Sequence, residues 1–158
     1  MRIQPRFMQP VKILIKQKQG YEDIPLPRYA SDGASGMDIR AAVDQDINIE
    51  PGDITLIPTG LFMSIPEGFE AQIRPRSGLA LHHGISILNA PGTIDSDYRG
   101  EVGIIIANIG KKPFKVSRND RIAQMVIQKV EKGILVETTE LPESSRGSGG
   151  FGHSGLAG

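Results

Sequence analysis

The chain's 158 residues suffice for one domain with a core of its own, since 39% of them are apolar. Its 18 basic and 18 acidic residues cancel to a formal net charge of zero, which argues against a nucleic-acid partner and favours a small phosphorylated ligand bound by a few local groups. The sequence has no cysteine, which excludes disulfides and cysteine-ligated zinc, and no apolar run long enough for a membrane span or a signal peptide, so we expect a cytoplasmic protein.

Short β-branched runs separated by turn residues predict an all-β domain. The 19 glycines and 11 prolines are spread along the chain, and turns such as Pro51-Gly52 and Pro66-Glu67-Gly68 recur roughly every ten residues, which is typical of a jelly roll or β-sandwich. The strands that we expect span residues 11–16, 47–49, 54–57, 61–65, 69–74, 85–88, 102–108, 114–116, 124–130 and 135–139.

One segment, residues 77–83, favours a helix. Ser77 is a good N-cap residue and Gly84 a good terminator, which leaves room for two turns at most. From Ser144 the sequence reads SSRGSGGFGHSGLAG, which has little to bury and by itself is expected to be disordered. We therefore expect a single domain over residues 1–143, with the order of residues 1–9 left open, and a glycine-rich arm over residues 144–158.

The hexapeptide PRSGLA at residues 75–80 has the composition of a phosphate site. Ser77 and Gly78 offer backbone amides at the start of the expected helix, and the guanidinium of Arg76 stands beside them. An ordinary helix cap with a surface arginine explains the same residues, and the hexapeptide alone does not separate the two interpretations.

A second stretch, NAPGTIDSDYRG at residues 89–100, lies between two expected strands and is predicted to form a hairpin. Asp95 stands between Ile94 and Ser96, so we expect a partly buried carboxylate suited to act as a general base. Tyr98 offers a flat face for a sugar or a base. The alternative is a polar turn with two solvated aspartates.

Two further stretches are weaker by themselves. In residues 119–124 a turn delivers Arg121 to the start of a strand, with Gln124 nearby, and the alternative is an arginine on a strand edge. In residues 34–41 Asp38 is flanked by apolar residues and could meet the water shell of Mg²⁺, which keeps several waters and few carboxylates. The alternative there is an aspartate that holds a turn.

The arm contains a G-x-G-x-x-G pattern at Gly147, Gly149 and Gly152. We reject a dinucleotide site because no βαβ unit surrounds the pattern. Arg146, Phe151 and His153 are spaced among the glycines as in a segment that folds onto a ligand, although a flexible tail with chance residues has the same composition. The adjacent histidines at 82 and 83 have no further ligands at metal spacing and are interpreted as helix surface.

These five stretches, in this order, resemble the five motifs of the homotrimeric dUTP pyrophosphatase (dUTPase) family over about residues 11–155. PRSGLA and the arm sequence RGSGGFGHSG are the most specific matches. The resemblance implies an all-β, dUTPase-like jelly-roll (β-clip) subunit with one short helix and a flexible C-terminal arm. It also implies a homotrimer with active sites at subunit interfaces, and hydrolysis of dUTP to dUMP and diphosphate with Mg²⁺ as cofactor.

The resemblance also assigns residue roles. The catalytic residue would be Asp95, which would contact the sugar 3′-hydroxyl and activate the attacking water, and Tyr98 would exclude a ribose 2′-hydroxyl. Asp38 would contact Mg²⁺ through water, while the substrate phosphates hold the metal. Uracil would be bound by Asn89 and the backbone that follows it, including Gly92, Thr93 and Ile94. The phosphates would be bound by Arg76, Ser77, Gly78, Arg121, Gln124 and Arg146. From the arm, Phe151 would stack on uracil, beside Gly152, with His153 and Ser154 on the phosphates.

The chain departs from the family pattern at two positions. Asn119 stands where the family often has glycine, and asparagine tolerates the left-handed backbone, so we expect the turn to be retained. Thr93 stands where an aliphatic residue is common. The alternatives to dUTP hydrolysis are a dCTP deaminase on the same fold and a non-catalytic jelly-roll module for assembly or ligand binding.

Overall fold

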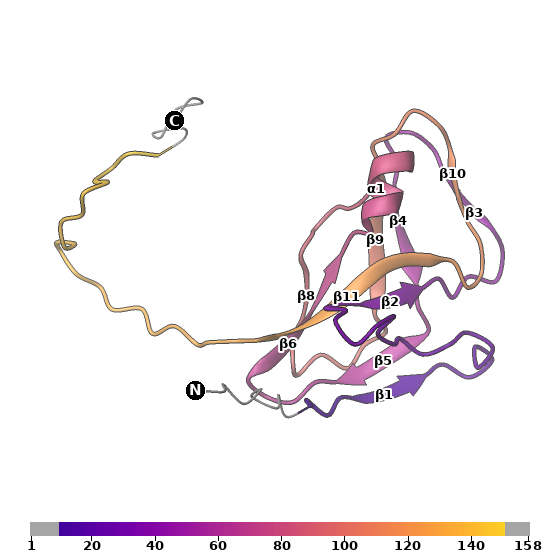
Figure 1. The fold of residues 1–158 in the computed structure, drawn as a ribbon, viewed down its shortest axis with the longest axis horizontal. Helices are drawn as coiled ribbons and strands as arrows, with labels where there is room; N and C mark the ends of the chain where they lie inside the picture. Colours follow the sequence, from indigo (N-terminus) through magenta and orange to yellow (C-terminus); the bar gives the residue numbers. More distant parts are fainter. Residues whose placement is uncertain (1–9, 151–158) are drawn as a thin grey trace, which may run out of the picture.

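The structure is a computed structural model that describes residues 10–150, and these form an all-β fold with one short helix (Figure 1). In chain order the elements are β1 (Leu14–Gln17), β2 (Met37–Arg40), β3 (Ile47–Ile49), β4 (Ile54–Pro58), β5 (Leu61–Ser64), β6 (Phe69–Arg74), α1 (Ser77–His83), β7 (Ile85–Ile87), β8 (Gly92–Ile94), β9 (Gly103–Asn108), β10 (Phe114–Val116) and β11 (Arg121–Lys129). The predicted all-β jelly-roll class is confirmed.

All strand pairs in the described part of the chain are antiparallel. The largest sheet has the order β2-β11-β6-β8, a second sheet has the order β4-β9-β7, and two strand pairs, β1-β5 and β3-β10, complete the fold. Neighbours in these sheets are far apart in sequence, so segments that carry the separate motifs are brought side by side. The four-stranded sheet is the one that matters for the site.

One hydrophobic core, rich in isoleucine, holds the sheets together. In β6 the side chains alternate as a half-buried surface requires, with Ala71 and Ile73 buried and Gln72 and Arg74 half-buried. The fully buried large side chains are those of Ile39, Ile49, Ile57, Ile85, Ile104, Ile106, Ile122, Val116, Asn108 and Thr59. β-branched residues fit this pleated interior well, which is why the β-branched runs predicted most strands correctly.

The strand predicted at residues 135–139 is wrong. β11 ends at Lys129, and the chain then runs away from the body without pairing (Figure 1). Ile134, Leu135 and Val136 are 80–98% exposed. The residues have strand propensity, but a strand also needs a neighbour to pair with, and the described part of this subunit provides none.

The seven-residue helix α1 is confirmed over the predicted residues 77–83, but its N-cap differs from the prediction. Arg76, in extended backbone, is the N-cap and makes no side-chain cap bond, so the prediction that Ser77 caps the helix is wrong. Gly84 ends the helix as predicted, with φ of 67° and its N–H bonded to the Ala80 carbonyl at 3.1 Å. A Cβ on Gly84 would lie 2.6 Å from the Gly110 nitrogen, so the glycine also permits a close approach. No helix formed by residues 10–150 is long and apolar enough to cross a membrane.

Candidate functional site

Two predicted arginines converge on one predicted carboxylate. Arg76 Nε lies 3.1 Å from one oxygen of Asp38, and Arg121 Nη1 lies 3.2 Å from the other. Arg76 Nη1 also donates to the Arg121 carbonyl at 2.9 Å. Asp38 and Arg76 are half-buried, with side chains 30% and 26% exposed. The three residues therefore form a linked unit that presents two guanidinium groups together.

The sheet order explains this convergence. Asp38 on β2 and Arg74 on β6 both lie opposite Gln124, because β11 runs between the two strands. The Gln124 amide donates to the Pro75 carbonyl at 2.9 Å and so fixes the chain just before Arg76. Gly36 makes room for this glutamine, since a Cβ there would lie 2.7 Å from Gln124 Oε1.

The turn before β11 delivers Arg121. Asn119 has φ of 70°, so the predicted tolerance of asparagine for this left-handed position is confirmed. Arg40, which the sequence did not single out, donates to the Asn119 carbonyl at 2.8 Å, and the Asn119 N–H donates to Ala41 at 2.9 Å. The Asp120 carboxylate accepts from the Ser117 N–H at 2.8 Å. The turn is thus held from both sides.

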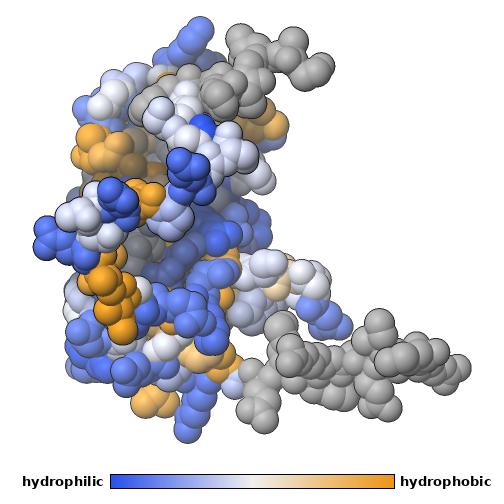
Figure 2. Space-filling model, turned by 90° about the vertical axis from the view of Figure 1, so that its left-hand side faces the viewer, coloured by the Kyte–Doolittle hydropathy of each residue, from blue (hydrophilic) through white to orange (hydrophobic). Residues whose placement is uncertain are grey.

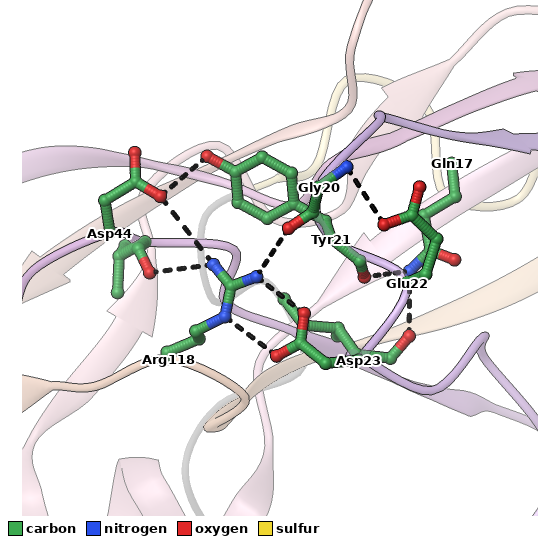
Figure 3. A network of polar contacts seen from close by, with 9 residues as sticks. Gln17, Gly20, Tyr21, Glu22, Asp23, Asp44 and Arg118 are labelled. Carbon is green, nitrogen blue, oxygen red and sulfur yellow. Dashed lines mark hydrogen bonds and ion pairs between the residues drawn. The ribbon is translucent and has the colours of Figure 1, made fainter.

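Arg118, in the same turn, holds the turn to the loop after β1 (Figure 3). Its guanidinium donates to both oxygens of Asp23, at 2.6 and 2.9 Å, and lies 4.5 Å from the centre of the Tyr21 ring. The hydrogen bond from Arg118 lowers the pKa of Asp23 below its usual value. Tyr21 in turn donates to Asp44 at 3.0 Å. No sequence motif indicated this network, because its members lie in separate segments.

The stretch at residues 89–100 forms a connection that is more structured than the predicted hairpin. Its flanking strands β7 and β9 do pair with each other. Between them β8 leaves for the other sheet and pairs with β6, where Gly92 lies opposite Ile73. Gly92 and Ile94 are buried, while Thr93 and Asn89 are exposed. Asn89 packs closely on Gly92, because a Cβ on that glycine would lie 3.1 Å from Asn89 Nδ2.

One tight turn brings the predicted catalytic carboxylate and the aromatic ring together. The Tyr98 N–H donates to the Asp95 carbonyl at 3.2 Å, and the Arg99 guanidinium donates to the Ser96 and Tyr98 carbonyls at 2.7 and 2.8 Å. Asp95 is exposed in the single subunit, so the expectation of a partly buried carboxylate is wrong for one chain. It directly follows β8, whose last residue, Ile94, is buried.

The predicted site residues thus fall into two groups, which flank β6. The first, called the arginine cluster below, consists of Asp38, Arg76 and Arg121 with Gln124. The exposed residues Ser77 and Gly78 begin α1 beside it. The Asp95–Tyr98 turn forms the other group. Within residues 10–150 no hydrogen bond or ion pair joins the two groups.

The arm residues stand apart from both groups. Arg146 is exposed, and its Nε donates to the Gly149 carbonyl at 2.7 Å within its own turn. Figure 1 shows the described residues after β11 as an extended tail that leaves the body of the fold. The predicted contacts of Phe151, Gly152, His153 and Ser154 lie outside the described residues.

The described residues contain no cluster of three or more His, Cys, Asp or Glu that could hold a metal ion. Both oxygens of Asp38 already contact arginines. Any Mg²⁺ at these residues would therefore take its oxygen ligands mainly from water and from a phosphorylated ligand.

Fold and site together define a jelly-roll protein with a paired-arginine site that can hold an anion. A family model described as dUTPase matches residues 22–155. The deoxyuridine 5'-triphosphate nucleotidohydrolase of Thermoanaerobacter sp. (strain X514) is 54% identical over 142 residues, which cover 90% of this chain and 96% of the relative. That of Methylocella silvestris is 51% identical over 151 residues, 94% of each chain. The chain belongs to the dUTPase family.

Solved structures agree with this assignment. The dUTPase of Staphylococcus bacteriophage 80alpha, solved with dUPNHPP, matches with a TM-score of 0.82 at 25% identity, over 92% of this chain and 99% of that one. A mutant dUTPase from phage phi11 of S. aureus, whose structure reveals the coordination of a structural Mg(II) ion, matches with a TM-score of 0.74 at 22% identity, over 84% and 99%.

Proposed function

We propose that this protein hydrolyses dUTP to dUMP and diphosphate, which limits uracil in DNA and supplies dUMP for dTMP synthesis. The observation that carries the proposal is the pair of arginines, Arg76 and Arg121, bound to the two oxygens of Asp38. Guanidinium groups in this arrangement can bind the oxygens of a triphosphate in several directions at once. The identity of the substrate, dUTP, is inferred from membership of the dUTPase family.

The triphosphate of the substrate would lie against the arginine cluster. Arg76 and Arg121 would neutralise charge that develops on the phosphates, and Gln124 would keep the Pro75 carbonyl and the chain before α1 in place. The backbone at Ser77 and Gly78 is exposed and without a side-chain cap, so its amides remain free for phosphate oxygens. Phosphoryl transfer depends mostly on such positioning and charge stabilisation.

The base would be bound along β8, and the sugar and the attacking water by the Asp95–Tyr98 turn. Uracil would lie along β8, at Asn89, Gly92, Thr93 and Ile94, where backbone groups can copy the pairing pattern of adenine. The Asp95 carboxylate would bind the sugar 3′-hydroxyl and activate the water that attacks the α-phosphorus. Tyr98 would lie against the deoxyribose and exclude a 2′-hydroxyl.

A homotrimer is part of the proposal, because one subunit does not bring the two groups into contact. Large apolar side chains also remain exposed in the single subunit, among them Leu56 of β4 and Leu135 of the tail, and hydrophobic patches are visible on the face shown in Figure 2. A neighbouring subunit would cover such surface and complete the site at the interface.

The arm, residues 144–158, would close the site from a third chain. Arg146 has no contact outside its own turn among the described residues, so its guanidinium is available for phosphate. Phe151 would stack on uracil, beside Gly152, with His153 and Ser154 on the phosphates. Mg²⁺ bound to the substrate phosphates would supply further charge neutralisation at the leaving diphosphate.

Pyrophosphate release tests the function directly. Purified protein with Mg²⁺ is given dUTP, dTTP, dCTP or UTP, and ammonia release from dCTP is measured in parallel. We expect release from dUTP, with the other nucleotides rejected by as much as ~10⁴ where buried polar groups go unpaired. Ammonia from dCTP would indicate the deaminase instead. A folded protein that turns over none of the four would leave the binding module as the better interpretation.

A further inference from the structure

The ring of Tyr98 is held by two features of the residues that follow it. Its hydroxyl donates to the Glu101 carbonyl at 2.9 Å. Gly100, between these two residues, is covered by the ring. The side chain of Tyr98 is nevertheless 44% exposed, so the ring is fixed at its far end while part of its surface stays open to a ligand.

Gly100 is a glycine because of space and not because of its backbone. It is not among the glycines with positive φ, so any residue could adopt its conformation. A Cβ at this position, however, would overlap the Tyr98 hydroxyl oxygen and lie 2.6 Å from Cζ and 3.0 Å from Cε2. A side chain at position 100 and the observed position of the ring exclude each other.

The backbone beneath the ring cannot yield easily. The Glu101 carboxylate accepts from the Gly60 N–H at 2.9 Å, and the Val102 N–H donates to the Leu61 carbonyl at 2.8 Å. The buried Thr59 hydroxyl donates to the Val102 carbonyl at 2.6 Å. Since this segment is fastened to the turn between β4 and β5 while the ring is partly exposed, an added methyl group would displace the ring.

We infer that Gly100 is a positioning residue for Tyr98 and thereby sets the preference for deoxyribose over ribose. The inference rests on the proposed function, in which the Tyr98 ring lies against the sugar. Steric exclusion of a hydroxyl requires the ring to stay within contact distance of C2′. A ring pushed outward leaves room for the 2′-hydroxyl. The arginine cluster, on the other side of β6, is unchanged.

The test compares pyrophosphate release from dUTP and UTP by the full-length protein and by Gly100→Ala. A small pocket rejects an added hydroxyl by roughly 10², and we expect the ratio of kcat/KM for dUTP to that for UTP to fall about tenfold in the variant. Gly33→Ala is the matched control, because a Cβ on Gly33 meets nothing within 4 Å. Its ratio should equal that of the unmodified protein. An unchanged ratio in a folded Gly100→Ala variant overturns the inference.

A double-mutant cycle separates positioning from general destabilisation. If Gly100 acts through the ring, Gly100→Ala should change the ratio no further in a Tyr98→Ala background. A further change there contradicts the inference, because it would mean that Gly100 affects the ratio without the ring. A loss of stability lowers the turnover of dUTP and UTP alike and leaves the ratio unchanged.

Tyr98→Phe keeps the ring and removes only its bond to Glu101, so it carries the test should Gly100→Ala fail to fold. We expect its ratio to fall about threefold, as for one hydrogen bond, and an unchanged ratio counts against the inference. Unmodified protein that releases nothing from dUTP would instead overturn the proposed function, which makes the two failures distinguishable.

Discussion

The arginines of the body and the arginine of the tail are held in different ways. Arg121 binds Asp38 across 83 residues of sequence, and Arg76 binds the Arg121 carbonyl across 45. Arg146 binds Gly149, three residues away. Long-range contacts fix a side chain relative to the whole fold, whereas a contact within one turn fixes it only relative to that turn. The body therefore presents its guanidinium groups before any ligand arrives, and the tail does not.

This difference separates two costs of binding. Residues that are already in place lose little conformational entropy when a ligand binds, while a segment such as 144–158 must be ordered at that moment. The same ordering can exclude water and complete a site only after the correct ligand is present. Under the proposed function, the body would supply recognition and the arm would supply closure.

The largest expected effect is in the body. Asp95→Asn keeps the shape of the side chain but removes the base, so we expect turnover of dUTP to fall by about 10²–10⁴ while the substrate still binds. Steady-state kinetics and binding of a non-hydrolysable dUTP analogue measure the two quantities. Asp97→Asn, in the same turn, is the control. Near-normal turnover by Asp95→Asn would remove Asp95 from its catalytic role.

A chain that ends at Ser145 tests the tail. We expect it to keep its fold and its trimer, since the hydrogen bonds of the described residues beyond Ser145 stay within the tail, and to lose turnover by about 10² because the site no longer closes. Size-exclusion chromatography, thermal unfolding and pyrophosphate release are the measurements. Full activity in this chain would contradict the arm hypothesis, and restoring Arg146 alone should not rescue it.

A smaller effect is expected from Arg76→Lys. The guanidinium of Arg76 uses two nitrogens to reach Asp38 and the Arg121 carbonyl together, which one ammonium group cannot do. We expect kcat/KM for dUTP to fall about tenfold, as for the loss of one charge-assisted hydrogen bond. Arg28→Lys, on an exposed loop, controls for the change of residue type. Equal kinetics in the two variants would mean that positive charge suffices at Arg76.

The smallest effect concerns Asp23 and pH. Hydrogen bonding to Arg118 lowers the pKa of Asp23 in the folded state, so this pair stabilises the fold above the ordinary carboxyl pKa of 3.8 and loses that contribution as pH falls through the lowered value. Asp23→Asn should therefore melt at a slightly lower temperature than the unmodified protein at pH 7, and this difference should close as the pH falls below 3.8 and through the lowered pKa of Asp23. Thermal unfolding of the two proteins at a series of pH values measures this difference. A difference in melting temperature that widens as the pH falls would contradict the prediction.

The sequence predicted those features that depend on local chemistry. Apolar residues alternating with polar ones located β6, a run of isoleucines located β9, Gly84 marked the end of α1, and Asn119 adopted the expected left-handed backbone. The motif stretches were also found, but the convergence of Arg76 and Arg121 on Asp38 was not, since it depends on the order of strands in the sheet.

Features that depend on a distant neighbour were missed or mistaken. The segment at residues 135–139 has strand propensity without a strand to pair with, and the short β2 and β8 contain Asp38 or Gly92, which have low strand propensity. The role of Gly100 follows from the position of the Tyr98 ring, which local propensity does not describe. Arg40 and Arg118 act on a turn that lies far along the chain.

Asp38 provides Arg76 and Arg121 with a counter-ion from within the fold. One carboxylate between Arg76 and Arg121 leaves a single net positive charge where two bare guanidinium groups would leave two. Under the proposed function, an incoming triphosphate would compete with this carboxylate for the two arginines, and the ion pairs would re-form when the diphosphate leaves. Other polyanions would meet the same competing carboxylate without contacts to a base and a sugar, so Asp38 would disfavour their binding to the two arginines.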